Sequence, residues 1–143
     1  MSDCIFCKII NGDIPSRRVY EDDDVLAFLD ISQVTKGHTL VIAKEHVRNL
    51  LDFTDEQASA LFSRIPKIAR AVKNAHPECK GLNMLMNSEE VASQSVFHAH
   101  VHLLPRYSKE SDGFGLKWIE QSDNYSDEDL DDIQAAIKDT LAN

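Results

Sequence analysis

Three histidines alternate with apolar residues in a short stretch near residue 100. Residues 94–104 have the sequence QSVFHAHVHLL, so three of the six histidines in the chain fall within five residues. Side chains alternate across a β-strand, and a strand here would therefore place His98, His100 and His102 on one face. The spacing predicts a row of imidazoles.

Such a row is compatible with three interpretations. The α-carbons of the outer two histidines would lie about 13 Å apart at a rise of ~3.3 Å per residue, so one metal ion cannot easily bind all three. A neighbouring pair could instead converge on one zinc ion at a Zn–N distance of ~2.0 Å. A neutral imidazole could also attack phosphorus and form a covalent phosphoramidate, which divides one difficult displacement into two easier ones. The third interpretation is that the histidines are half-exposed residues without a chemical role.

The residues just before the row favour phosphate chemistry. Residues 88–90 (SEE) and 93–95 (SQS) supply backbone amides and hydroxyl groups. Amides and hydroxyls stabilise charge on phosphoryl oxygens without positively charged side chains. In that arrangement His100, the central histidine, is best placed to attack phosphorus.

Cys4 and Cys7 form a second group with potential chemistry. Their two-residue gap is typical of structural zinc sites, which need two further ligands. A redox pair would follow a strand at the start of a helix, and the first three residues leave no room for such a strand. The remaining interpretation is two partly buried thiols. Cys79, the third cysteine, and His76 flank Pro77 in a loop and are given no role.

Short strands and turns must position these groups. Apolar and β-branched runs predict strands over residues 18–21, 25–29, 38–43, 81–87 and 96–104. The acidic run at 21–24 is interpreted as the solvated turn of a hairpin. Residues 4–10 indicate a short helical turn that ends at Asn11-Gly12.

Two capping boxes predict the longer helices. Thr54 and Gln57 form the first, and Pro66 predicts that the long helix after it is kinked or broken in two. Ser126 and Asp129 form the second, at the start of an acidic C-terminal helix over residues 126–142. We expect the apolar stripe of this helix to dock on the body of the chain or on a partner subunit. The stripe consists of Leu130, Ile133, Ile137 and Leu141.

Length and composition restrict the function further. The 143 residues contain no linker or repeat, so a single domain over residues 1–143 is expected. No apolar run approaches the ~18 residues of a membrane helix, and no secretion signal is recognised, so we expect a cytoplasmic protein without a membrane partner. The net charge is −9, with eight acidic residues and a single lysine in 120–143. Since no basic face is present, nucleic acid is not an expected partner, whereas a small phosphorylated ligand is.

The alternating histidines and several other segments resemble the histidine-triad (HIT) family over nearly the whole chain. The segments are Ile5-Phe6, Phe28-Leu29-Asp30-Ile31, Gly37-His38, Asn87, Gln94-Ser95-Val96 and residues 98–104. The resemblance implies an α+β, HIT-like fold with a five-stranded antiparallel sheet, one long helix and a C-terminal helix. It also implies a homodimer that binds purine nucleotides. The chain looks most similar to small nucleoside phosphoramidases, which release AMP from adenosine 5′-phosphoramidates.

The resemblance also implies roles for individual residues. His100 would be the nucleophile on the α-phosphate, and Ser95, His38 and His102 would hold phosphate oxygens or assist departure of the leaving group. Asp30 would accept hydrogen bonds from the ribose hydroxyls. The base and sugar would lie in an apolar pocket formed by Ile5, Phe6, Ile9, Phe28, Ile31 and Leu40. The remaining nucleotide-binding positions are Asn87, Gln94 and Val96. Packing in the hydrophobic core explains the presence of Phe6 and Phe28 equally well.

Some members of the family bind structural zinc through a cysteine pair and two histidines. By that similarity the ligands here are Cys4, Cys7, His46 and His98, and no cofactor is required for the chemistry. A zinc-bound His98 would leave His100 free to act on phosphorus. One departure from the family pattern is Ser93, which stands where many members have glycine and could narrow the phosphate site.

Other functions remain open. A dinucleoside polyphosphate hydrolase and a nucleotide-binding scaffold with vestigial activity share the expected fold. A metal-dependent hydrolase would use His98 and His100 as ligands of a catalytic ion. Residues 113–118, which include Phe114 and Trp118, could be a substrate lid or ordinary surface packing.

Overall fold

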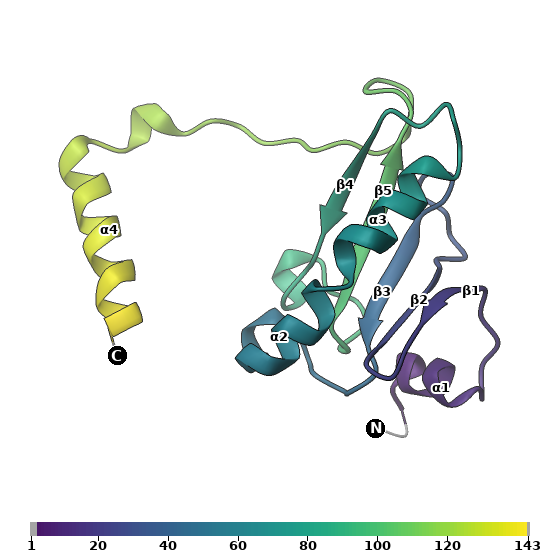
Figure 1. The fold of residues 1–143 in the computed structure, drawn as a ribbon. Helices are drawn as coiled ribbons and strands as arrows, with labels where there is room; N and C mark the ends of the chain where they lie inside the picture. Colours follow the sequence, from purple (N-terminus) through teal and green to yellow (C-terminus); the bar gives the residue numbers. More distant parts are fainter. Residues whose placement is uncertain (1–2, 143) are drawn as a thin grey trace.

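The computed structural model describes residues 3–142 and contains one five-stranded antiparallel sheet. The strand order is β1-β2-β3-β5-β4 (Figure 1). The strands are β1 (Arg18–Glu21), β2 (Val25–Leu29), β3 (Thr39–Ala43), β4 (Gly81–Leu85) and β5 (His100–Arg106). The helices are α1 (Ile5–Asn11), α2 (Asp55–Phe62), α3 (Ile65–Asn74) and α4 (Asp127–Ala142). Short 3-10 turns η1–η3 occupy Leu50–Asp52, Glu90–Ala92 and Ser122–Asn124. The predicted α+β fold with a five-stranded antiparallel sheet is confirmed.

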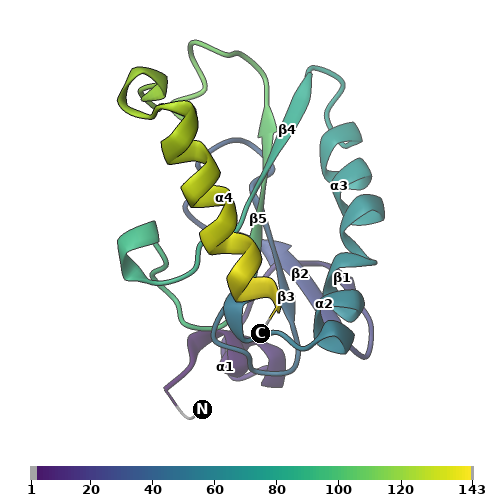
Figure 2. The same ribbon diagram turned by 90° about the vertical axis from the view of Figure 1, so that its left-hand side faces the viewer.

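Both faces of the sheet are covered, because the central strands carry apolar residues in both directions. On one face Val25, Val41 and Val101 pack against α2 and α3. On the other face Leu26 and Ile42 pack in a cluster with residues of α1. Figures 1 and 2 show α2 and α3 together on one side of the sheet and α1 near the opposite side. Burial of each large apolar side chain contributes about 1.5–3 kcal/mol, so this double layer stabilises the strands that carry the histidines.

The helix predicted after Thr54 is broken in two, as Pro66 indicates. The capping box is present: Thr54 Oγ1 accepts from the amide of Gln57 at 3.1 Å, and Gln57 Oε1 accepts from the amide of Thr54 at 2.9 Å. Helix α2 ends at Phe62, and Pro66 occupies the first turn of α3. Proline is tolerated there because the amides of a first helical turn have no intrahelical partner.

Strand β5 differs from the prediction at both ends. It begins at His100 rather than residue 96, and it continues beyond residue 104 to Arg106. The predicted start was wrong because the preceding residues bond to the segment after β3 instead of a neighbouring strand. The amide of Ala99 donates to the carbonyl of Val47 at 2.7 Å. Strand β4 likewise ends at Leu85, two residues earlier than predicted, and β3 begins at Thr39.

The C-terminal helix α4 begins with the predicted capping box but lies away from the sheet (Figure 1). The amide of Ser126 donates to Asp129 at 2.9 Å, and the amide of Asp129 donates to Ser126 Oγ at 3.1 Å. The four residues of the apolar stripe are between 43% and 81% exposed. Of the two surfaces expected to cover this stripe, the body of the chain does not do so. Within residues 3–142, no helix is long and apolar enough to cross a membrane.

Candidate active site and metal site

The three histidines of the row lie close together, although only two of them are in β5. His100 pairs with Ile42 and His102 pairs with Leu40 of β3. The rings of His100 and His102 have centroids 5.1 Å apart. His98 precedes the strand and is fully buried. The ring of Phe6 meets both His98 and His100 edge-on, at centroid distances of 5.9 and 5.1 Å. The row therefore forms against α1.

The hydrogen bond of His100 determines which of its ring nitrogens carries the proton. Nδ1 of His100 lies 2.8 Å from the carbonyl oxygen of His98. A carbonyl can only accept, so Nδ1 carries the proton and Nε2 of the neutral ring keeps a free lone pair. Burial lowers the pKa of His100 and thus favours this neutral form. An imidazole in this state can act as a nucleophile.

A chain of hydrogen bonds fixes the tautomers of His38 and His102 in the same way. The backbone amide of Val34 donates to Nδ1 of His38 at 3.3 Å, so the proton of neutral His38 is on Nε2. That nitrogen lies 2.9 Å from Nδ1 of His102 and donates to it. The proton of neutral His102 is consequently on its own Nε2. Burial and the neighbouring His100 and His38 lower the pKa of His102 to about 4.

Asp30 lies beside these histidines at the end of β2. Its Oδ2 is 3.7 Å from Nε2 of His38. Burial would raise the pKa of Asp30, but hydrogen bonds from the hydroxyl and amide of Ser32 to Oδ1 outweigh burial and keep the pKa below its usual value. Asp30 is therefore a carboxylate that accepts hydrogen bonds, as binding of sugar hydroxyls would require.

The ligand atoms of Asp30, His38 and His102 lie within 4.8 Å of one another, as in a metal site. The tautomer of His38 argues against a cation there. Its Nδ1 already accepts from an amide, so a metal on Nε2 would require removal of the last ring proton. These three residues are better suited to a hydrogen-bonded chain.

Gln33, which the sequence analysis did not identify, supports the loop between Asp30 and His38. Its amide nitrogen donates to the carbonyls of Asp30 at 2.6 Å and His38 at 2.8 Å. Its amide oxygen accepts from the backbone of Gly37 at 2.8 Å. The backbone of Gln33 has a φ of +42°, which is unfavourable for a residue with a side chain. No pattern in the sequence distinguishes this glutamine from an ordinary loop residue.

The six residues predicted to form the base pocket differ in burial. Four of its residues, Phe6, Ile9, Phe28 and Leu40, are buried in one cluster, and Val96 packs against them. Phe6 and Phe28 meet edge-on with ring centroids 5.6 Å apart. Ile5 and Ile31 lie outside the buried cluster and are exposed. The four buried residues contribute to the core on this face, and the side chains of Ile5 and Ile31 are exposed.

The loop between β4 and the histidine row carries the predicted phosphate-binding residues. Ser95 is exposed, and the side chain of Asn87 donates to the carbonyl of Ser93 at 3.4 Å. Gln94 instead lies behind the loop, where it is 3% exposed and both ends of its side-chain amide are hydrogen-bonded within the protein. Ser93 has a φ of +74°, which explains why glycine would suit this position.

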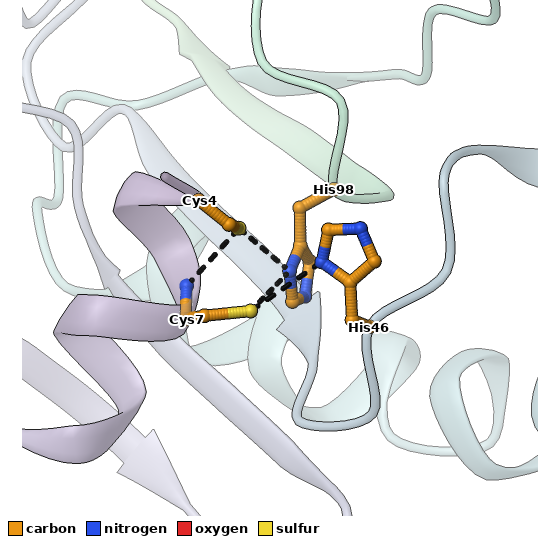
Figure 3. A group of neighbouring side chains, drawn as sticks. All are labelled: Cys4, Cys7, His46 and His98. Carbon is orange, nitrogen blue, oxygen red and sulfur yellow. Dashed lines mark hydrogen bonds between the residues drawn. The ribbon is translucent and has the colours of Figure 1, made fainter. Parts of the chain in front are cut away.

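The four predicted zinc ligands meet between α1, the start of β5 and the loop after β3 (Figure 3). Nδ1 of His98 is 3.4 Å from Sγ of Cys4 and 3.6 Å from Sγ of Cys7. Nδ1 of His46 is 3.4 Å from Sγ of Cys7. A tetrahedral zinc with Zn–S of ~2.3 Å and Zn–N of ~2.0 Å has S···N edges of about 3.5 Å, so these side chains fit that ion.

The protonation of this cluster also fits a cation. Nε2 of His98 donates to the carbonyl of Ala43 at 2.6 Å, which leaves the lone pair of Nδ1 directed to the thiols. The thiol of Cys4 accepts from the amide of Cys7 at 3.3 Å, so the first turn of α1 brings both sulfurs to one side. Burial and the neighbouring Cys4 raise the pKa of Cys7 to about 11. A bound cation would reverse this shift, because metals bind the thiolate.

Comparison with known proteins shows which family the chain resembles in sequence and structure. A family model described as the HIT domain matches residues 11–109. The Bacillus subtilis protein named Protein hit is 59% identical over 139 residues, which cover 97% of this chain and 94% of that protein. The crystal structure of a HIT-family member from Bacillus subtilis superposes with a TM-score of 0.91 at 58% identity and covers 96% of each chain.

Two further relatives have informative names. An adenosine 5′-monophosphoramidase of Candida albicans is 34% identical over 142 residues, which cover 97% of this chain and 91% of that protein. The crystal structure of a zinc-bound histidine-triad family protein from Mycobacterium smegmatis has a TM-score of 0.71 at 38% identity, with 81% of this chain and 84% of that chain covered.

Proposed function

The chain belongs to the HIT domain family, and from this premise we propose that it is a nucleotide-binding hydrolase. Its substrates are nucleoside 5′-phosphoramidates or related nucleotidyl conjugates, and its product is AMP. The hydrolase names of relatives such as the Candida albicans phosphoramidase support this reaction class. The observation that carries the proposal is the hydrogen bond from Nδ1 of His100 to the carbonyl of His98, which leaves Nε2 as a free nucleophile.

In the first step, Nε2 of His100 attacks the α-phosphorus and forms a P–N bond. The bond from phosphorus to the leaving nitrogen breaks, and this nitrogen carries a proton taken up from solvent, so it departs as a neutral amine. Nε2–H of neutral His102 donates a hydrogen bond to the departing group, and His38 holds His102 in this tautomer along their 2.9 Å contact. In the second step, water attacks phosphorus and releases one proton to solvent, the P–N bond to His100 breaks and AMP is released.

Other residues of the proposed site bind the substrate. The hydroxyl of Ser95 and the neighbouring amides hold the non-bridging phosphate oxygens, where charge increases in the transition state. Asn87 lies on the same loop and assists this binding. Asp30 accepts from the ribose hydroxyls, and Ile5, Ile31 and Val96 contact the base and sugar at the edge of the buried cluster. Gln94 acts from behind the loop.

A zinc ion held by Cys4, Cys7, His46 and His98 is part of the proposal. It would supply structural stability by linking α1, the loop after β3 and the residues before β5. Fixing His98 also fixes its carbonyl, which is the group that orients His100. His98 is thereby reserved for the metal, and His100 is reserved for the reaction.

The proposal includes a homodimer located in the cytoplasm. The exposed stripe of α4 offers an apolar surface for a second copy of the chain. The three cysteines are unpaired, and free thiols persist in the reducing cytoplasm. Light scattering of the full chain tests the oligomeric state, and a monomer at micromolar concentration would contradict this part.

Turnover of two adenylated substrates tests the proposed activity. Adenosine 5′-phosphoramidate should release AMP faster than a diadenosine polyphosphate does, because Nε2–H of His102 can donate a hydrogen bond to an amine leaving group. The reverse preference would indicate a dinucleoside polyphosphate hydrolase. Tight AMP binding with no turnover of either compound would indicate a nucleotide-binding scaffold and would contradict the proposal.

A further inference from the structure

A polar network behind residues 87–96, the loop that carries Ser95, connects Gln94 with Asn49 and Glu89, two residues that the proposed mechanism does not use. We propose that Asn49 and Glu89 are positioning residues, which act through Gln94 to hold Ser95 and the neighbouring amides in place for phosphate. This inference rests on the function proposed above, because it concerns the same loop. Neither residue touches the reacting atoms in the proposed mechanism.

Gln94 is the centre of the network. Its side-chain oxygen accepts from the amide of Glu89 at 2.8 Å and from Nδ2 of Asn49 at 3.1 Å. Its side-chain nitrogen donates to the carbonyl of Arg48 at 2.8 Å and to the carbonyl of Val96 at 3.0 Å. The loop is thus bound on both sides of Ser95 to the segment after β3.

Hydrogen bonds of Glu89 hold the beginning of the loop against the segment after β3. The carboxylate of Glu89 accepts from Nε and Nη2 of Arg48, both at 2.9 Å, and from Nδ2 of Asn49 at 2.7 Å. The hydrogen bonds from Arg48 and Asn49 lower the pKa of Glu89 to about 2, so the carboxylate stays ionised at neutral pH. Its backbone has a φ of +79° and a ψ of 158°, a conformation that a residue with a side chain rarely adopts. Such a conformation persists where surrounding contacts enforce it, as this network does.

Asn49 bonds to both Glu89 and Gln94. Its side chain is 1% exposed, and its nitrogen is shared between Glu89 and Gln94. Its oxygen accepts from the amide of Leu51 at 3.0 Å, which fixes the orientation of the amide. A buried polar group with every bond satisfied holds its neighbours in one arrangement.

Apolar packing cannot do the same for this loop. Val91 is 98% exposed, and Glu90, Ala92 and Ser93 are exposed as well. The order of the loop therefore depends on hydrogen bonds. A displacement of about 1 Å in a substrate-positioning group can slow a reaction roughly a hundredfold. Loss of the side chain of Glu89 or of Asn49 should therefore reduce turnover more than it reduces stability.

The test uses the variants Glu89→Ala and Asn49→Ala. Glu89→Gln keeps an acceptor for Asn49 and serves as the conservative variant. Glu90→Ala is a matched control at the adjacent exposed residue. Hydrogen–deuterium exchange of the amides of residues 93–96 is measured without ligand, together with the thermal midpoint and turnover of adenosine 5′-phosphoramidate. In both alanine variants, exchange in the loop should rise while exchange in β2 and β3 stays at the wild-type rate. We expect kcat to fall about tenfold or more with a smaller change in KM. Glu89→Gln should recover part of this loss, and Glu90→Ala should match the wild type.

Unchanged exchange at residues 93–96 in both alanine variants would overturn the inference. It would equally be overturned if the loop exchanged faster but kcat did not fall. If the wild-type protein shows no turnover, the proposed function fails separately. AMP affinity then replaces kcat: weaker binding in the two alanine variants, but not in Glu90→Ala, supports the positioning role, and equal binding in all variants overturns it.

Discussion

His98 and His100 are two residues apart, and their rings donate protons from opposite nitrogens. Nε2 of His98 donates to the carbonyl of Ala43, so its Nδ1 lone pair faces Cys4 and Cys7. Nδ1 of His100 donates to the carbonyl of His98, so its lone pair is on Nε2. Two identical side chains are thereby suited to different tasks, metal binding and nucleophilic attack. The backbone carbonyl next to each ring makes this difference.

Substitution of the two histidines should separate these tasks. His100→Ala should lower turnover by at least roughly a thousandfold, because the nucleophile is lost, and should leave bound zinc unchanged. His98→Ala should reduce the zinc content and lower the thermal midpoint, while the folded fraction retains more turnover than His100→Ala. Steady-state kinetics and metal analysis of the purified variants measure both effects. Equal turnover in His100→Ala and the wild type would show that the assignment is wrong.

Removal of the metal should affect the fold before it affects the chemistry. We expect about one zinc per chain in protein that has never met a chelator, and stripping it should cost at least about 2 kcal/mol, or several degrees in the thermal midpoint. Turnover should decline only as fast as the protein unfolds. Cys7→Ser should reproduce the lower midpoint. Immediate loss of turnover in a chelator, with the fold intact, would instead support a catalytic metal ion.

Acid should lower the free energy of unfolding through the buried neutral histidines His38 and His102. The pKa of His38 is lowered by burial, and that of His102 is lowered to about 4 by burial and its two neighbours. The unfolded chain, with histidine pKa values near 6.5, then binds more protons, so stability is lost as the pH falls from about 6.5 toward 4. Denaturant unfolding at several pH values measures this loss. His102→Gln should flatten the decline, and His76→Gln, outside the row, should keep it. A wild-type free energy of unfolding that is constant from pH 7 to 5 would contradict the buried neutral histidines.

The smallest expected effect concerns Ser93, in the loop that precedes the histidine row. Ser93 has a φ of +74°, and glycine adopts this conformation without strain. Ser93→Gly should therefore stabilise the protein by up to about 1 kcal/mol, as measured by denaturant unfolding. Ser88→Gly, in the same loop outside these positive-φ positions, serves as the control and should not stabilise. A destabilised Ser93→Gly would mean that the serine side chain makes a compensating contact.

Local sequence patterns predicted much of the fold. Both capping boxes, the hairpin at residues 21–24 and the helix break at Pro66 follow from short-range physical chemistry, and all are present. The start of β5 did not follow, because the amide of Ala99 bonds to Val47, a partner more than fifty residues away. The position of α4 also depends on contacts beyond its own sequence.

Some features of the candidate site could be predicted from the sequence, and others depend on contacts between distant residues. The residue types and spacing of Cys4, Cys7 and the histidine row indicated the two sites, and the family pattern added His38 and His46. Tautomers, however, depend on which carbonyl or amide reaches each ring, as Ala43 does for His98 and Val34 for His38. Gln33 and Asn49 were missed, and Glu89 was named only for its backbone amide. The side chains of Asn49 and Glu89 bond across about forty residues, and Gln33 has a positive φ, neither of which a local pattern indicates.

Trapping the covalent intermediate tests the assignment of His100 most directly. Protein mixed with adenosine 5′-phosphoramidate is quenched within milliseconds under conditions that preserve a P–N bond, digested and examined by mass spectrometry. The account predicts an added AMP group on the peptide that contains residues 98–102, located at His100 by fragmentation and missing from His100→Ala. An adduct on His98 or His102, or rapid turnover with no adduct at any time, would contradict it.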